Sequence, residues 1–250
     1  MNIISNTVGY FFWAVSCFWV CVPTVEAQNL ALDAAAASQC GKSDDEREGA
    51  AFNRKDYSEQ EAAAFRQKAE KGDASAMLEY ARWEKLSNPE RIAWLRRAAE
   101  ANLPHAQYSL ATYPQSGLGR DEIFHWLQLA AVQGHNEAQS TLGIRYATLK
   151  PSYGKGAEVA AEYWTVKAAE NGNGYSLSFL CRRAYRMAPV RGDQDYKQAV
   201  YWCEKALALG CNTARKMMAE MYENGHGVTK DLAKAGEIFS KYLNNPQIKE

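Results

Sequence analysis

The sequence of 250 residues lacks the alternation of apolar and polar side chains that marks a β-strand, so we expect no sheet. It also lacks an excess of either charge, because 29 Lys and Arg residues balance 29 Asp and Glu residues. Proteins that bind nucleic acid usually carry a net basic face, and this balance argues against that class. The hydrophobic share of 47% and the charged share of 23% are ordinary for a folded protein. These features favour a helical protein.

The sequence contains none of the short motifs that identify common enzyme sites. There is no Gly-x-Ser-x-Gly nucleophile elbow, no phosphate-binding Walker loop and no dinucleotide fingerprint. The four histidines, His105, His125, His135 and His226, lie far apart, and no Cys and His residues are spaced as a metal-ligand set. We therefore predict no catalytic residue, no metal site and no cofactor, and we expect the chain not to be an enzyme.

Basic residues are absent before Lys42, although the first residues are strongly apolar. Residues 10–22 form an apolar run that is shorter than the ~20 residues of a membrane span. Residues 25–27 (Val-Glu-Ala) have the small −3 and −1 residues of a secretory cleavage site. We predict a signal peptide over residues 1–27 and a periplasmic or secreted protein. The alternatives are an uncleaved membrane anchor or a lipoprotein attached through Cys17.

The chain does contain an internal repeat. In residues 195–231, two helical segments with apolar residues at spacings of three and four flank Gly210, which stops the first helix. Similar segments recur upstream, with periods between turn residues in the range of 20–50 residues that indicates a solenoid of stacked helix pairs. The turn residues are Gly72, Asn102, Gly134, Gly172 and Gly210.

Small and large residues also recur at fixed places in each unit. Two small positions follow each turn and let the next helix approach closely; they are Ala76, Ala106, Ala138, Ser176 and Ala214, and then Ala81, Ala111, Gly143, Cys181 and Ala219. A tryptophan lies four residues before an alanine in four of the helices that precede a turn, at Trp94, Trp126, Trp164 and Trp202. We expect these indole rings to supply the large apolar surface between units.

This pattern resembles Sel1-like repeats, which are relatives of the tetratricopeptide repeat. The most similar segments are residues 138–146, 161–172 and 222–231. The resemblance implies an all-α protein, a right-handed α-α superhelical solenoid of about five Sel1-like helix pairs, and an exported bacterial member of the family.

The resemblance covers residues 58–245 and suggests how the chain is divided. We assign residues 1–27 to a signal peptide, 28–57 to a linker or N-terminal cap, 58–245 to the Sel1-like array and 246–250 to a C-terminal tail. Ser58 and Glu61 have the spacing of a capping box, which predicts that the first helix of the array begins there.

Four cysteines, Cys40, Cys181, Cys203 and Cys211, remain after the predicted signal peptide, and an even number in an exported protein favours disulfides. Secreted relatives in the family join cysteines with the spacing of Cys203 and Cys211. Here Cys203 lies about 10 Å along its helix from the turn, which exceeds disulfide reach. A Cys181–Cys203 bond is equally compatible with the sequence. A third interpretation is that these cysteines are free, buried thiols.

The related tetratricopeptide geometry implies that the helix after each turn lines a concave surface where partners bind. The partner-binding residues predicted on these helices are Arg82, His105, Tyr108, Tyr175, Ser178, Arg182, Tyr185, Arg186, Lys216 and Glu220. The same helices also place Leu78, Lys85, Thr112, Ser140 and Ile144 on this side.

One part of this surface is distinctly basic. Arg182, Arg183, Arg186 and Arg191 lie close together in an otherwise neutral chain, and arginine and tyrosine are enriched in binding hot spots. We expect this cluster to receive a carboxylate or an acidic surface of a partner. The alternative is that the arginines only solvate the helix and pair with Asp193 and Asp195.

The predicted function is the binding of another protein in the periplasm or outside the cell. The resemblance allows two binding roles, an immunity protein that neutralises a secreted toxin and a general cell-envelope adaptor or scaffold. It also allows a third role of another class, because cysteine-rich Sel1-like relatives include proteins that bind or hydrolyse β-lactams.

Overall fold

The computed structural model describes residue 40 and residues 52–243. The predicted signal peptide, most of the predicted linker and the predicted tail therefore lie outside the described residues. Within residues 52–243 the elements are helices, and the bridge between Lys55 and Trp83 is isolated rather than part of a strand. None of these helices combines the length and the apolar character that a membrane crossing requires.

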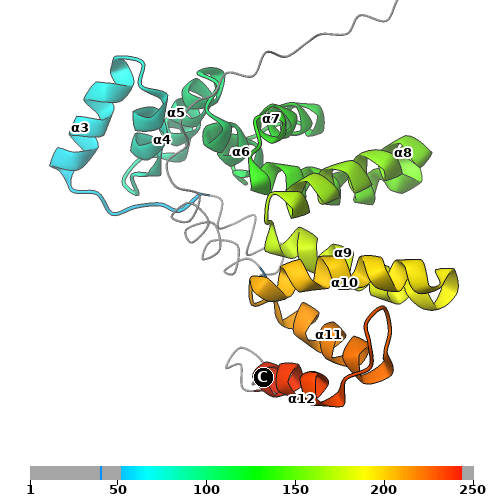
Figure 1. Ribbon diagram of the computed structural model, residues 1–250. Coiled ribbons are helices and arrows are strands. Elements are labelled where there is room, and N and C mark those ends of the chain that lie inside the picture. The colour runs from blue at the N-terminus through cyan, green and yellow to red at the C-terminus, as the bar shows by residue number, and fades with distance from the viewer. Residues whose placement is uncertain (1–39, 41–51, 244–250) are drawn as a thin grey trace, which may run out of the picture.

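Helices follow one another along the chain, and each packs on the next (Figure 1). They are α3 (Glu59–Glu70), α4 (Ala74–Arg82), α5 (Asn88–Glu100), α6 (Pro104–Thr112), α7 (Arg120–Val132), α8 (Asn136–Glu170), α9 (Gly174–Arg191), α10 (Asp193–Ala208), α11 (Asn212–Asn224) and α12 (Leu232–Leu243). This succession of packed helices forms the all-α superhelical repeat array that the sequence predicts.

The predicted turns stop the helices as expected. Gly72, Gly134, Gly172 and Gly210 all have positive φ, and Asn102, with φ of 61°, is the residue other than glycine with positive φ in the described part of the chain. Asparagine takes this left-handed conformation more readily than most side chains, so it replaces glycine at the second turn at low cost.

Helix starts are also encoded locally. Ser58 and Glu61 form the predicted capping box, with the Ser58 N–H donating to Glu61 Oε2 at 2.9 Å. The side chains of Asp73 and Asn173 accept backbone N–H groups at the starts of α4 and α9. These caps satisfy backbone donors that have no partner within the helix, and they place each helix start next to its turn.

Helix α8 consists of two arms. Its backbone is non-helical at Gly154, where φ is 62° and ψ is −147°, so residues 136–153 and 155–170 form a hairpin of two helices. Gly143 lies where the arms cross, because a Cβ atom at this position would be 2.5 Å from Thr165 Oγ1 and 3.1 Å from the Thr165 backbone nitrogen. The missing side chain at Gly143 therefore permits this close crossing.

The core is divided into two main clusters. One runs from Phe52 to Leu142 and includes Leu95, Leu110 and Leu127, which have no exposed surface. The other runs from Ala169 to Ile238. The predicted tryptophans pack against these clusters, with Trp126 and Trp202 buried and Trp94 and Trp164 partly buried. The boundary between the clusters falls within the second arm of α8, because Trp164 packs on the first cluster and Ala169 belongs to the second.

Candidate functional site

The helices that follow the five turns form a set that we call the first-helix row. It contains α4, α6, the first arm of α8, α9 and α11. Eight of the ten predicted partner-binding residues have exposed or partly exposed side chains on this row. They are Arg82, His105, Tyr175, Arg182, Tyr185, Arg186, Lys216 and Glu220.

The other two predicted residues are buried and offer no surface to a partner. Tyr108 is 6% exposed, and its ring lies 4.8 Å from the ring of His135. Ser178 is 8% exposed. Leu78, Thr112 and Ser140 are likewise buried, because the helix after each turn also packs on the neighbouring units. Position in the repeat is therefore not enough to identify a surface residue.

Arg82 is already engaged within the first unit of the row. It lies 2.7 Å from Glu79 Oε1, while Glu79 Oε2 accepts hydrogen bonds from Lys55 at 3.0 Å and from Tyr57. Burial raises the pKa of Glu79, but these hydrogen bonds and the Arg82 charge outweigh it and hold the pKa below its usual value. This cluster ties residues 55–57 to α4.

The basic cluster of α9 is more open. Arg186 is exposed, and Arg182 and Arg183 are partly exposed. Arg183 pairs with Glu162 on the second arm of α8 at 3.5 Å, so its acidic neighbour comes from another helix than the sequence suggested. The side chains of Arg191 and Asp193 lie outside the described part of the structure.

Tyr185 connects α9 with α11 across the row. Burial raises the pKa of Tyr185 to about 12, and its hydrogen bond with the Glu220 carboxylate adds to this rise. The phenol therefore stays neutral at physiological pH and donates to Glu220. This contact brings two predicted residues from successive units together, next to Arg182 and Arg186.

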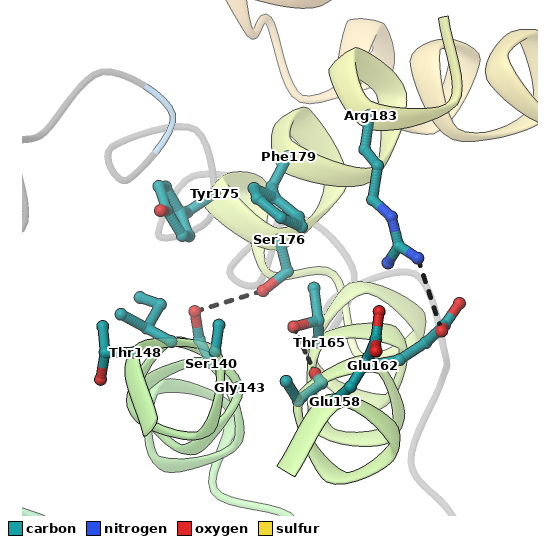
Figure 2. A pocket seen from close by; sticks show the side chains of 13 residues that line it. Ser140, Gly143, Thr148, Glu158, Glu162, Thr165, Tyr175, Ser176, Phe179 and Arg183 are labelled. Atoms are coloured by element: carbon teal, nitrogen blue, oxygen red, sulfur yellow. Dashed lines mark hydrogen bonds and ion pairs between the residues drawn. The ribbon is translucent and has the colours of Figure 1, made fainter. Parts of the chain in front are cut away.

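A pocket of about 390 Å³ opens between the two arms of α8 and α9 (Figure 2). We call it the α8–α9 pocket. Three of its residues, Ser140, Ile144 and Tyr175, were placed on the partner side by the sequence. The remaining lining residues are Gly143, Ala147, Thr148, Glu158, Ala161, Glu162, Thr165, Ser176, Phe179 and Arg183.

Two departures from the repeat pattern accompany this pocket. Ser140 occupies the position that Tyr108 fills in the preceding unit, counted from Ala138 and Ala106. Thr165 occupies the position of Leu127, a core residue with no exposed surface. Two large side chains are thus replaced by small ones in the unit that has the pocket. The next unit also has small residues at these positions, Ser178 and Cys203, so the sequence alone does not identify the pocket.

Hydroxyl groups line the interior of the pocket. Ser176 donates to Ser140 Oγ at 3.2 Å, and Thr165 donates to the Ala161 carbonyl oxygen at 2.7 Å. Figure 2 shows the rings of Tyr175 and Phe179 above these groups, and the ring centroids lie 6.5 Å apart in a stacked arrangement.

The histidines are dispersed, apart from one pair on the row. His135 is buried, and its ring centroid lies 4.6 Å from that of His105. Its Nδ1 accepts the Ala138 N–H at 3.3 Å and so caps α8. Burial lowers the pKa of His135 to about 4. The nearby Glu137 carboxylate at 3.4 Å is therefore not in an ion pair at neutral pH, because the acceptor Nδ1 carries no proton.

Two disulfides join the cysteines that follow the predicted signal peptide. Cys181 and Cys203, 4.7 Å apart at Cα, connect α9 with α10, which is the pairing that the sequence left open as an alternative. Cys211 pairs with Cys40 rather than with Cys203. The family spacing of eight residues is therefore not used for a disulfide here. Among the described residues, no three His, Cys, Asp or Glu side chains gather as metal ligands.

Comparisons with solved structures show which fold this is. A Sel1 repeat protein from Oxalobacter formigenes superposes with a TM-score of 0.60 at 23% identity, over 74% of this chain and 56% of that one. The protein c5321, a protective antigen of uropathogenic Escherichia coli with an SLR fold, superposes with a TM-score of 0.57 at 24% identity, over 72% of this chain and 40% of that one.

Two curated proteins are similar in sequence. An uncharacterized protein of Neisseria meningitidis is 30% identical over 166 residues, which are 64% of this chain and 33% of that protein. The chitin synthase regulator SKT5 of Saccharomyces cerevisiae is 26% identical over 164 residues, which are 62% of this chain and 23% of that protein. The chain thus spans a third or less of the length of these relatives.

The Sel1 repeat model of this family matches five stretches of the chain, residues 92–103, 104–135, 137–173, 184–211 and 213–241. Together they cover more than half of the sequence. Sel1-repeat proteins generally mediate protein–protein interactions and are typically not catalytic. The chain belongs to the Sel1 repeat family.

Proposed function

We propose that this chain is an exported module that binds one partner protein along the first-helix row. The observation that carries the proposal is the surface formed by α9 and α11. There Arg182, Arg186 and Lys216 offer cationic groups, and the hydrogen-bonded pair of Tyr185 and Glu220 lies beside them. Arginine and tyrosine supply much of the binding energy in protein interfaces, and Arg182 and Arg186 can each hold a carboxylate with two parallel hydrogen bonds.

Export is supported by two independent features. The predicted signal peptide directs the chain out of the cytoplasm, and the two disulfides suit an oxidising compartment such as the periplasm.

The finer role that we propose is that of an immunity protein, which neutralises a secreted toxin by covering its surface. An array that binds through a long row of helices can cover a large surface without any catalytic group. The alternative role, that of an adaptor, is supported by the yeast relative, whose name describes it as a regulator of chitin synthase.

The experiment is purification of the disulfide-bonded protein from the periplasm of its own host, followed by mass spectrometry and a direct titration of the bound protein. A single toxin bound in stoichiometric amount, encoded next to this gene, supports immunity. Several envelope proteins in place of a toxin support the adaptor role. Purification without a bound protein, together with turnover of a chromogenic β-lactam, would overturn the proposal in favour of the enzyme class.

The basic residues are tested with the double variant Arg182→Ala and Arg186→Ala. Because two hot-spot side chains are lost, the affinity for the partner protein should fall by roughly thirtyfold or more. The matched control is Lys197→Ala with Lys205→Ala on α10, which removes two exposed cations outside the row. If both double variants bind the partner with the same affinity as the wild type, α9 is not part of the binding surface.

A further inference from the structure

We infer that the Cys40–Cys211 disulfide limits how far the array can bend at the contact between α8 and α9, which we call the α8–α9 joint. Cys40 precedes the first helix of the array, whereas Cys211 is the residue before α11. The bond therefore connects the N-terminal part of the chain with a helix beyond the joint. The inference goes beyond the proposed function, because it concerns the shape of the array rather than its partner.

The α8–α9 joint has a hollow and partly polar packing. The α8–α9 pocket of about 390 Å³ lies at this joint, and the hydroxyl groups of Ser176 and Ser140 meet across it at 3.2 Å. The two core clusters also remain separate, since Trp164 packs on the first and Ala169 belongs to the second. Close packing makes a protein interior resist deformation, so we expect bending where the packing is interrupted. In Figure 1, α3 to α8 lie on one side of the joint and α9 to α12 on the other.

The chain before α3 is fixed to the first side of the joint. Phe52 is buried in the first core cluster, and its ring centroid lies 5.4 Å from that of Tyr113 at the end of α6. The Lys55 N–H donates to the Arg82 carbonyl oxygen at 2.8 Å. These contacts hold the chain against α4 and α6 from Phe52 onward.

Cys40 is fixed to the second side of the joint. Its side chain packs against the second core cluster, and it is bonded to Cys211, which has no exposed surface. The Sγ atom of Cys211 lies 3.7 Å from the Gly174 carbonyl oxygen at the start of α9. The disulfide thus lies next to the starts of α9 and α11, and both of these helices are beyond the joint.

The length of chain between the two anchors sets the limit. Phe52 follows Cys40 by twelve residues, and a chain of this length spans at most about 43 Å when it is fully extended. This limit holds for any conformation of the intervening residues. While the disulfide is intact, the array cannot bend so far that the anchors move further apart than this. Bends that approach the limit also cost chain entropy, because the intervening residues must then extend.

The second disulfide provides a matched control. Cys181 and Cys203 join α9 with α10, and both helices lie beyond the joint. This bond is enclosed within one side of the array and therefore places no limit on the α8–α9 joint. A variant without it reports any general loosening that follows from the loss of a disulfide.

The test measures a distance across the joint in the full disulfide-bonded protein. Spin-labelled p-acetylphenylalanine replaces Lys68 on α3 and Glu223 on α11, two exposed residues, so that the cysteines stay unlabelled. Double electron–electron resonance then gives the distribution of distances between the labels, and we expect it to be single and narrow. In Cys40→Ser, which removes the bond but keeps the buried Cys211, the distribution should become broader and shift to longer distances.

A second measurement separates the covalent link from the local packing of the bond. A protease site inserted after Asp45 allows the chain to be cut while the disulfide stays intact. Cutting the folded protein should produce the same shift to longer distances as Cys40→Ser. Because the cut follows folding, this measurement stands even if Cys40→Ser fails to fold.

The control variant, Cys181→Ala with Cys203→Ala, should keep the distance distribution of the parent protein. An unchanged distribution after the chain is cut would overturn the inference, because the link then sets no limit on the joint. A shift in the control variant as large as that in Cys40→Ser would also overturn it, because loss of either disulfide then loosens the array in the same way.

Discussion

Arg91 illustrates at the scale of a single residue how the array uses a buried charge. The side chain has no exposed surface and donates to the backbone carbonyls of Trp83 at 3.0 Å and Leu86 at 2.9 Å, as well as to that of Ala81. Ala81 lies in the last turn of α4 and Trp83 and Leu86 follow its end, where carbonyl groups have no partner within the helix. Burial lowers the pKa of Arg91, but its guanidinium remains protonated in the protein.

Replacement of Arg91 by Met keeps the apolar stem and removes the donors. Several buried carbonyl oxygens then lose their hydrogen bonds, and we expect the free energy of unfolding to fall by about 3 kcal/mol. Urea unfolding followed by circular dichroism measures the change. Arg97→Met on the same helix is the control, because Arg97 is exposed and lies over the Trp94 ring at 4.1 Å. Equal losses for both variants would contradict the role assigned to Arg91.

His135 makes the stability of the array depend on pH. Burial lowers its pKa to about 4, against about 6.5 in an unfolded chain, and the charge of Glu137 only partly opposes this. The unfolded state therefore binds a proton first as the pH falls. The stability due to neutral His135 is fully present above pH 6.5 and is lost as the pH falls towards 4.

Protonation also ends the helix cap, because Nδ1 can then no longer accept the Ala138 N–H. We expect the wild type to lose about 3 kcal/mol of stability from pH 7 to pH 4 through this residue. The facing groups are His105 and Tyr108 on α6 and Glu137 on α8 itself. Unfolding curves of the wild type and of His135→Asn, which can cap without titrating, measure this contribution. An identical pH dependence in both proteins would contradict it.

At the scale of a single element, a substitution can test how closely the two arms of α8 cross. Gly143→Ala places a Cβ atom against Thr165 Oγ1 and the Thr165 backbone, so the arms must separate. We expect a loss of about 1–3 kcal/mol. Gly156→Ala on the second arm is the matched control. Nothing lies within 4 Å of its added Cβ, and alanine should stabilise the helix by about 0.5–1 kcal/mol. Similar thermal midpoints for the two variants would show that the arms do not cross closely at Gly143.

The five turns and the start of the first helix were predicted from the sequence, because turn and cap chemistry is local, whereas the breaks at Gly154 and Gly192 were not predicted. Asn102 and Gly210, which were predicted as turn residues of the repeat, have a left-handed backbone conformation, and the Ser58 capping box starts α3. The side chains that face a partner were harder to identify. Tyr108 and Ser178 occupy the expected helices but are buried, because the contacts between units depend on every side chain at a junction.

The α8–α9 pocket shows the same limit. Ser140, Ile144 and Tyr175 lie on the helices where the sequence predicted them and line the pocket, whereas the contributions of Thr165 and Arg183 depend on how the arms of α8 cross and how α9 lies on them. A repeat pattern shows what a position usually holds. It does not show which of two units with small residues at the same positions, Ser140 and Thr165 or Ser178 and Cys203, leaves a pocket.

At the scale of the whole molecule, one disulfide joins parts of the chain that are distant in sequence, and the other joins two consecutive helices. Cys40 and Cys211 are 171 residues apart, and Cys181 and Cys203 are 22 apart. Peptide mapping of the unreduced protein should recover these two pairs. A peptide pair containing Cys203 and Cys211 would contradict the arrangement of α9, α10 and α11.

Removal of the shorter link should destabilise the array. The double variant Cys181→Ala and Cys203→Ala frees a loop of 22 residues in the unfolded chain, which corresponds to about 3 kcal/mol in the loop-entropy description. Urea unfolding under oxidising conditions measures the loss. The control is the same comparison of the wild type and the double variant in reducing buffer. Both proteins then lack the Cys181–Cys203 bond, so their free energies of unfolding should differ far less.

The central claim concerns the face of the array that meets the partner. Hydrogen–deuterium exchange of the protein, alone and with its co-purified partner, tests it most directly. Binding along the first-helix row predicts slower exchange in the first arm of α8, in α9 and in α11, with little change in α7, α10 and α12. Slower exchange confined to α7, α10 and α12, with α9 unchanged, would contradict the claim.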